Sequence, residues 1–348
     1  MFCLRSREYI VPSVCGPLTT SLATLEYFTE AVLAAEPWLI DPVTIPLPWR
    51  RDLAAKPTRP LRIGYYYDDG AVRVQPPHEF AVRKVVAALT EAVHEGERAT
   101  ELLIELPSLM QYEVSKWDTE DHAYGYDLWL KAVKADGGRR CRLQCEKEGE
   151  PLIEGMVVGT KEDELNVEEG EAVRSIPTSP PVQSKCMLIV SQLHREIREY
   201  QKMYLSHWQE SGVDALILPV QPYVGLRPRE WVKSSQYIGY SAIWNLLDYT
   251  GLVMPVPVPD AEDIEDVECD PRGKWEDHKP RNEGDRYNWE QCKKFDVAES
   301  AMLILITDDP SLIKGVPIDV QIVTGKFGEE KAVAVAKAVE EALSSAST

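Results

Sequence analysis

The sequence predicts an α/β fold in which helices cover both faces of a mixed β-sheet. The prediction starts from residues 213–259, where two short apolar segments flank an amphipathic helix. The first segment, 213–220, is a continuous apolar run that ends at a Gln-Pro pair, which is typical of a strand buried on both faces. The second, 252–256, contains Pro255 and is followed by another proline, so we expect it at a sheet edge.

The helix between these strands is predicted by the spacing of its apolar residues. Positions i, i+3, i+4 and i+7 of one helical face are Tyr240, Ile243, Trp244 and Leu247. Gly251 follows them, and glycine is the residue most often found just past the end of a helix. We therefore expect Gly251 to end this helix.

The N-terminal part of the chain predicts a helix, a loop and a βα unit. Thr20 or Ser21 is expected to cap a helix that runs to about residue 35. Its inward residues are expected to be Leu22, Leu25, Phe28 and Val32. A proline-rich loop over 37–49 precedes a strand at 61–67, a turn at 68–70 and a helix opened by Pro77. The inner face of this helix is predicted to contain Phe80, Val85 and Leu89.

The rest of the chain adds elements of both kinds. Helices are predicted over about 128–133, 194–208 and 329–343, and an alternating strand over 315–325. Residues 260–287 are acidic and poor in apolar side chains, so we expect a long exposed loop there.

Composition excludes several classes of function. The formal net charge of −19 argues against nucleic acid and anionic membranes as partners, because both need a basic surface. No apolar run is long enough to cross a bilayer, and the first residues lack the apolar core of a secretory signal, so the expected location is cytoplasmic. Cys141 and Cys145 have no second Cys or His pair at zinc-finger spacing, so neither a metal nor a cofactor is expected.

Residues 214–219, 237–250 and 253–255 resemble the C-terminal half of the amidase signature family, closest to the fungal acetamidase-type general amidases. The Gly-Tyr, Trp-Asn and Asp-Tyr-Thr groups of this stretch recur in register over about forty residues. The resemblance implies a partial amidase signature fold, with residues 1–348 forming the C-terminal part of a single domain.

The resemblance also implies hydrolysis of carboxamides to a carboxylate and ammonia or an amine. Family members use a nucleophilic serine in a Gly/Ser-rich stretch, a second serine in a cis peptide and a buried lysine, all N-terminal to the segment that matches 11–21 here. No Gly-Gly-Ser stretch occurs in this chain. We therefore assign no catalytic residue and expect a truncated, catalytically incompetent fragment with uncovered strand edges and helix faces. The alternative is a non-catalytic pseudoenzyme or binding protein that keeps the wall of the cleft.

Three segments interrupt the resemblance, at about 96–113, 175–192 and 292–308. Codons for Gly96-Glu97 and Cys292-Lys293 can contain a splice donor, and codons for Ser191-Gln192 and Thr307-Asp308 an acceptor. The hypothesis is that these segments are retained introns, which comparison with cDNA would test. The alternative is surface insertions, which loops tolerate readily.

Five of the candidate substrate-binding residues lie in the segment that resembles the wall of the amidase cleft, and Tyr223 follows the end of a predicted strand, where pockets tend to form. The six candidates are Tyr223, Tyr237, Tyr240, Trp244, Asn245 and Asp248. The expected ligand is a small amide, which is bound once the missing catalytic part is supplied. A homodimer is possible. The structural alternative is that Trp244 and Leu247 belong to the core, Asp248 caps the helix or forms an ion pair, and the tyrosines only pack.

Overall fold

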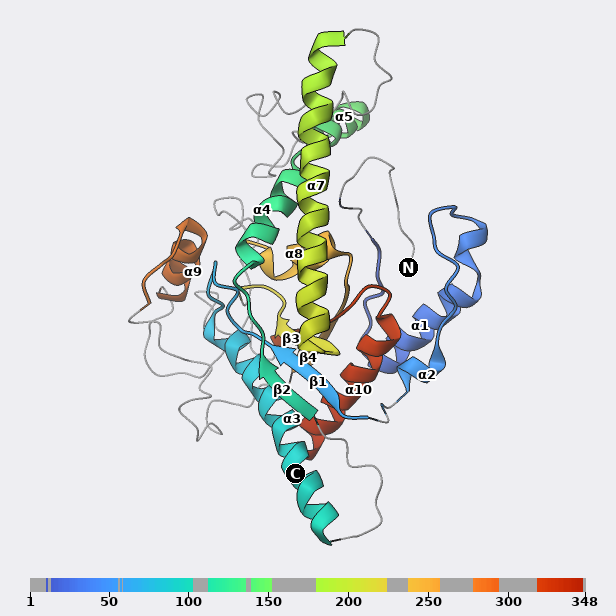
Figure 1. The fold of residues 1–348 in the computed structure, drawn as a ribbon, viewed down its shortest axis with the longest axis vertical. Coiled ribbons are helices and arrows are strands. Elements are labelled where there is room, and N and C mark those ends of the chain that lie inside the picture. Colours follow the sequence, from blue (N-terminus) through green and yellow to red (C-terminus); the bar gives the residue numbers. More distant parts are fainter. Residues whose placement is uncertain are drawn as a thin grey trace.

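The computed structural model of this chain describes residues 11, 14–55, 57, 59–102, 112–135, 139–151, 180–223, 237–256, 278–293 and 318–346. At its centre is a five-stranded sheet with strand order β2-β1-β3-β5-β4 (Figure 1). The strands are β1 Leu61–Tyr65, β2 Tyr112–Lys116, β3 Ala215–Pro219, β4 Thr250–Val256 and β5 Ile318–Thr324. β1 pairs in parallel with β2 and β3, whereas β5 pairs antiparallel with β3 and β4. The sheet is therefore mixed, which confirms the predicted fold class.

The burial of each strand follows from its place in the sheet. All five residues of the central strand β3 are buried, as its continuous apolar run predicts. β4 instead alternates between buried and exposed residues, with Leu252, Met254 and Val256 facing inward. β4 is also the last strand in the order, so the prediction of an edge strand is confirmed.

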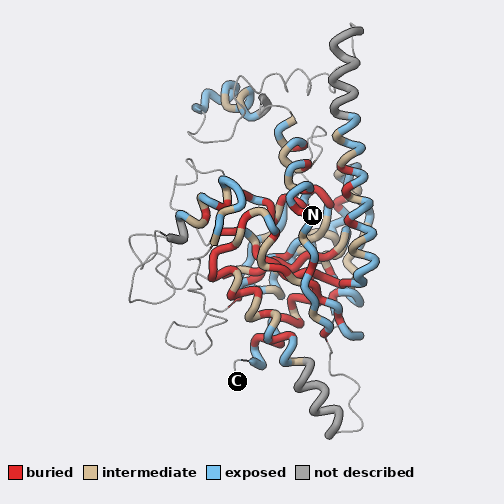
Figure 2. Tube along the Cα trace, turned by 60° about the vertical axis from the view of Figure 1, so that its left-hand side comes forward, coloured by how far each residue is buried: buried red, intermediate tan, exposed pale blue. Residues whose placement is uncertain are grey.

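Helices cover both faces of the sheet, as predicted, and each face has its own core. On one face α3 (Pro76–Leu102) and α10 (Glu329–Ser345) pack against inward side chains of β1, β3, β4 and β5. On the other face lie α4 (His122–Val133), α7 (Pro180–Ser211) and α8 (Gly239–Leu247). Figure 2 shows that the buried residues gather where these layers meet, around the sheet. The predicted inner face of α3 is confirmed, since Phe80, Val85 and Leu89 are buried.

The N-terminal segment lies against α10 and contains α1 (Leu22–Ala34), the 3-10 helix η1 (Pro37–Leu39) and α2 (Arg51–Ala54) (Figure 1). The predicted cap is confirmed, because Ser21 Oγ accepts a hydrogen bond from the Thr24 backbone N–H at 3.2 Å. The expectation that Phe28 points inward is wrong. Phe28 is 49% exposed, and α1 has no fully buried residue.

Two expected boundaries are corrected near helix ends. α8 ends at Leu247, and its C-cap is Asp248 in the left-handed conformation, at φ 59°. Gly251 belongs to β4 and does not end the helix. Asp248 takes the role expected of a glycine because a short polar side chain tolerates this backbone region better than most residues do. The helix predicted at 128–133 begins earlier, at His122.

The predicted exposed loop at 260–287 is corrected at its C-terminal end. Helix α9 spans Glu283–Lys293, and Asp285 and Asn288 on it are fully buried. Their burial is stabilised by hydrogen bonds with distant residues, which composition does not reveal. Residues 260–277 of the loop lie outside the described residues.

The three segments that interrupt the resemblance are described only in part. Where the structure covers them, residues 96–102 continue α3, β2 begins at Tyr112, residues 180–192 belong to α7, and 292–293 end α9. Their origin as introns or insertions stays a prediction. Within the described ranges, no helix is long and apolar enough to cross a membrane.

Candidate functional site

The candidate site lies at the end of the sheet that is formed by the carboxyl ends of the parallel strands β1 and β3. The loops that leave these strands, 66–75 and 220–223, meet there because the carboxyl ends of neighbouring parallel strands lie at the same end of a sheet. The Gln75 backbone N–H donates to the Pro222 carbonyl at 2.9 Å and joins the two loops directly. α8 and α9 approach the same end of the sheet, where Tyr240 of α8 and Asp285 of α9 hold loop 66–75.

Asp69 is the centre of the first group of contacts, and it is only 2% exposed. Its Oδ1 accepts hydrogen bonds from the backbone N–H groups of Ala71 at 2.9 Å and Val72 at 3.0 Å. Its Oδ2 accepts from the Tyr237 hydroxyl at 2.6 Å. Burial raises the pKa of Asp69 to about 6, although these three hydrogen bonds oppose the rise by favouring the carboxylate.

Tyrosines from α8 and its neighbouring loops surround this carboxyl group. The Tyr240 hydroxyl donates to the Val72 carbonyl at 2.7 Å and accepts from the Asp69 backbone N–H at 3.2 Å. The Tyr223 hydroxyl accepts from the Tyr237 backbone N–H at 2.6 Å, and burial raises the pKa of Tyr223 to about 12. These phenols are therefore neutral at physiological pH, and they serve as hydrogen-bonding groups.

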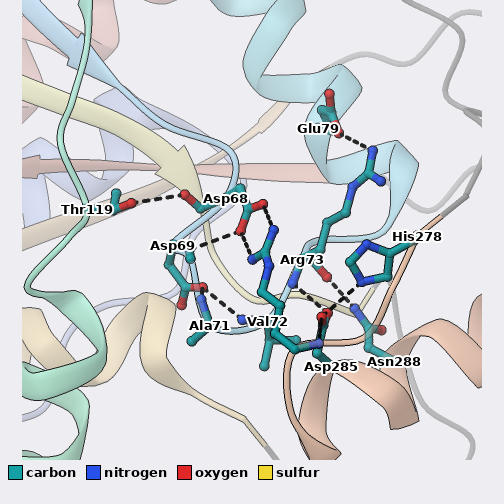
Figure 3. Close-up of polar contacts among 12 residues, drawn as sticks. Asp68, Asp69, Ala71, Val72, Arg73, Glu79, Thr119, His278, Asp285 and Asn288 are labelled. Carbon is teal, nitrogen blue, oxygen red and sulfur yellow. Dashed lines mark hydrogen bonds and ion pairs between the residues drawn. The ribbon is translucent and has the colours of Figure 1, made fainter.

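A second group of contacts joins the same turn to α9, as Figure 3 shows. Asp285, which is fully buried, accepts from the backbone N–H groups of Arg73 at 3.0 Å and Arg281 at 2.9 Å. Its Oδ2 also lies 2.9 Å from His278 Nε2. Arg281 in turn forms a two-point ion pair with Asp68. The turn at 68–73 is thus held from both sides, by α8 and by α9.

The structure brings together four of the six candidate residues predicted from the sequence. Tyr223, Tyr237, Tyr240 and Trp244 are all buried in the cluster on the α8 face of the sheet. Asn245 and Asp248 are exposed, and Asp248 Oδ2 lies 2.5 Å from the Lys326 ammonium. Trp244 and Leu247 thus belong to the core and Asp248 forms an ion pair, as the structural alternative to substrate binding predicts.

Sequence reasoning missed the acidic residues that organise this site. Asp68-Asp69-Gly70 is predicted only as a turn, although carboxylates a few residues after a strand are a usable signal for a site, since β1 ends at Tyr65. Asp285 had no such signal, because its partner Arg73 is 212 positions away in the chain. Long-range pairing of this kind cannot be inferred from spacing along one sequence.

The chemistry available at this site is hydrogen bonding. The Asp69 carboxylate and the hydroxyls of Tyr223, Tyr237 and Tyr240 are engaged with one another or with the backbone. Within the described residues, no three His, Cys, Asp or Glu side chains are arranged to hold a metal ion. The arrangement therefore fixes the shape of the two loops, and no activated nucleophile is evident in it.

Replacing Asp69 with asparagine is expected to remove a pH-dependent loss of stability. Between pH 4 and pH 6 the unfolded chain releases the Asp69 proton and the folded chain keeps it, so the free energy of unfolding falls as pH rises through this window. At about 1.4 kcal/mol per pKa unit, the Asp69→Asn variant should gain up to about 3 kcal/mol relative to the parent between pH 4 and pH 7. Urea unfolding at several pH values measures this difference, and parallel profiles for the two proteins would contradict it.

Comparison with known proteins assigns the family. The Amidase family model matches residues 9–333. The acetamidase of Emericella nidulans is 29% identical over 340 residues, which cover 94% of this chain and 50% of that protein. Amidase 1 of Gibberella moniliformis is 27% identical, with 96% of this chain and 53% of that protein covered. This chain therefore spans about half the length of these curated relatives.

The solved structures agree on the fold. A fatty acid amide hydrolase superposes with a TM-score of 0.63 at 21% identity, covering 97% of this chain and 49% of that one. The match extends over almost all of the chain, as the family model does, and it includes the strands and helices that build the candidate site. The chain accordingly belongs to the amidase family, as the motifs of its sequence predict.

Proposed function

We propose that this chain forms the substrate-side part of a carboxamide hydrolase and that it does not hydrolyse amides alone. The observation that carries the proposal is the family match over residues 9–333 in a chain without a Gly-Gly-Ser stretch. A serine hydroxyl is inert near neutral pH until a positioned base takes its proton. A chain that lacks the stretch holding that serine lacks the nucleophile of the family mechanism.

The candidate residues support a role in shaping the wall of a cleft. Tyr223 and Tyr237 lie at the carboxyl ends of the strands, where α/β proteins commonly bind ligands. Their polar atoms hold the loops at this end of the sheet. We propose that Tyr240 and Trp244 support the wall from within the core. Asn245 and Asp248 face solvent, so they would contact a small amide on a face of α8 other than the one that carries Tyr240 and Trp244.

The test is an activity assay of the purified full chain with acetamide and benzamide, combined with labelling by a fluorophosphonate that reacts with activated serines. We expect no ammonia release above the buffer rate and no labelled serine. The acetamidase of Aspergillus oryzae, which is 27% identical, serves as the positive control. Stoichiometric labelling of any serine in the chain would overturn the proposal.

The alternative function, a binding protein that retains the cleft wall, is distinguished by a second measurement on the same protein. It predicts saturable binding of an amide by calorimetry without any hydrolysis.

A cytoplasmic location, the absence of a nucleic-acid partner and a homodimer remain predictions from the sequence.

A further inference from the structure

The core between the sheet and the α4, α7 and α8 layer contains buried polar atoms that no described residue pairs with. They are two tyrosine hydroxyls, an imidazole Nδ1 and an indole Nε1, which belong to Tyr66, Tyr200, His122 and Trp244. Each of these residues is at most 3% exposed. Buried polar atoms in folded proteins almost always have a hydrogen-bond partner, and ordered water supplies it where no protein group does. The pairing of these four atoms therefore needs an explanation.

The four side chains form one continuous cluster around His122. The centroid of the His122 ring lies 5.1 Å from that of Tyr66 and 5.8 Å from that of Trp244, with the rings edge to face in both contacts. The Tyr204 ring extends the cluster, at 5.8 Å from Trp244 and 5.9 Å from Tyr200. Burial raises the pKa of Tyr66, and the nearby hydroxyls of Tyr204 and Tyr200 add to the rise. The polar atoms thus share one region of the core.

The hydrogen bonds that do form in this cluster leave Nδ1 of His122 without a partner. The Trp117 indole Nε1 donates to the Tyr204 hydroxyl at 2.9 Å, and the same hydroxyl lies 3.1 Å from His122 Nε2. Burial lowers the pKa of His122 to about 3, so its ring is neutral at physiological pH and has one donor and one acceptor nitrogen. Whichever nitrogen carries the proton, Nδ1 needs a partner that the described residues do not supply.

We propose that this cluster is a buried hydration site, in which one or more water molecules complete the hydrogen bonds of Tyr66, His122, Tyr200 and Trp244. Water fits the set because the indole only donates, whereas the hydroxyls and the imidazole can also accept, and water does both. The occupant has to be small, since the rings lie in direct contact with one another.

The hydration site borders the candidate functional site through one ring contact. Tyr66 stacks on Tyr240 at a centroid distance of 6.1 Å. The Tyr240 hydroxyl in turn binds the Val72 carbonyl and the Asp69 backbone N–H. Water held at the Tyr66 hydroxyl would fix the ring on which Tyr240 stacks. The inference does not depend on the proposed function, because it concerns water in the core and not an amide in the cleft.

The direct test is oxygen-17 magnetic relaxation dispersion of water, which detects water molecules that stay bound much longer than those at the surface. We expect the full chain with Tyr66→Phe/Tyr200→Phe to hold at least one long-lived water fewer than the parent protein. Tyr27→Phe, at a side chain that is 75% exposed, is the matched control and should keep the parent's dispersion. A parent protein without any long-lived water, or an unchanged dispersion in the double variant, would overturn the hydration site.

Stability provides a second test, in which the sign of the effect is decisive. A hydroxyl that is bonded to buried water contributes to folding, whereas removing a hydroxyl that is buried without a partner is favourable. We therefore expect Tyr66→Phe and Tyr200→Phe each to lower the folding equilibrium constant by about threefold to tenfold, as measured by urea unfolding. An unchanged or increased constant in either variant would contradict the bound water. Circular dichroism checks that each variant remains folded.

Discussion

Replacing Asp285 with alanine is expected to lower the free energy of unfolding by about 3–5 kcal/mol. Its carboxylate accepts hydrogen bonds from two backbone N–H groups, those of Arg73 and Arg281, and lies 2.9 Å from His278 Nε2. Alanine would remove the buried carboxylate that joins these groups, and losing several contacts at once costs more than a single hydrogen bond contributes. Urea unfolding followed by tryptophan fluorescence measures the loss.

Two variants test the cause of this effect. Asp285→Asn keeps one oxygen acceptor and should lose clearly less stability than the alanine variant. Glu283→Ala changes an exposed residue on the same helix and should stay within about 0.5 kcal/mol of the parent protein. If Asp285→Ala were as mild as Glu283→Ala, the contacts between α9 and the turn at 68–73 would not contribute to folding.

Replacing Leu216 with alanine in the central strand is expected to cost about 2–5 kcal/mol, because its side chain is fully buried between the sheet and the α8 layer. Leu216 also packs over Gly64 of β1, its partner in the parallel ladder. A Cβ atom at Gly64 would lie 2.5 Å from Leu216 Cδ2, so Gly64→Ala alone should cost about 1–3 kcal/mol through overpacking.

The double variant distinguishes this local fit from general damage to the sheet. Leu216→Ala opens the space that the alanine methyl group at position 64 needs, so the double variant should lose less than the sum of the single losses, by about 1 kcal/mol or more. Denaturant unfolding of all four proteins completes the cycle. Additive losses would show that Gly64 is required for a reason other than contact with Leu216.

The sequence predicted the parts of this fold that depend on local patterns. The apolar run at 213–220 and the helical spacing of Tyr240, Ile243, Trp244 and Leu247 identified a central strand and a buried helix, because burial imposes these patterns directly. Phe28 was placed wrongly for the same reason. Its spacing indicates an apolar face of α1, but the pattern does not say whether this chain contains the surface that covers it.

The remaining parts depend on contacts between distant residues. The candidate site is organised by Asp69 with Tyr237 and by Asp285 with Arg73, pairs that are 168 and 212 positions apart. Composition indicated that the acidic region before 287 was exposed, and it could not distinguish a solvated carboxylate from one that accepts several hydrogen bonds. Tyr237 and Tyr240 are predicted at the site only through the family resemblance, and Tyr223 through its position after a strand end.

The position of β5 has a consequence for synthesis on the ribosome. β5 lies between β3 and β4, yet it is the last of the five strands to be translated. Until residues 318–324 emerge from the exit tunnel, β3 lacks one of its neighbours, and β4 lacks the one strand that pairs with it within the described residues. The nascent chain therefore exposes the edge of the apolar strand β3 while residues 220–317 are translated, and unpaired apolar edges of this kind favour aggregation and chaperone binding. A stop codon before residue 318 would separate β4 from the three strands β2, β1 and β3.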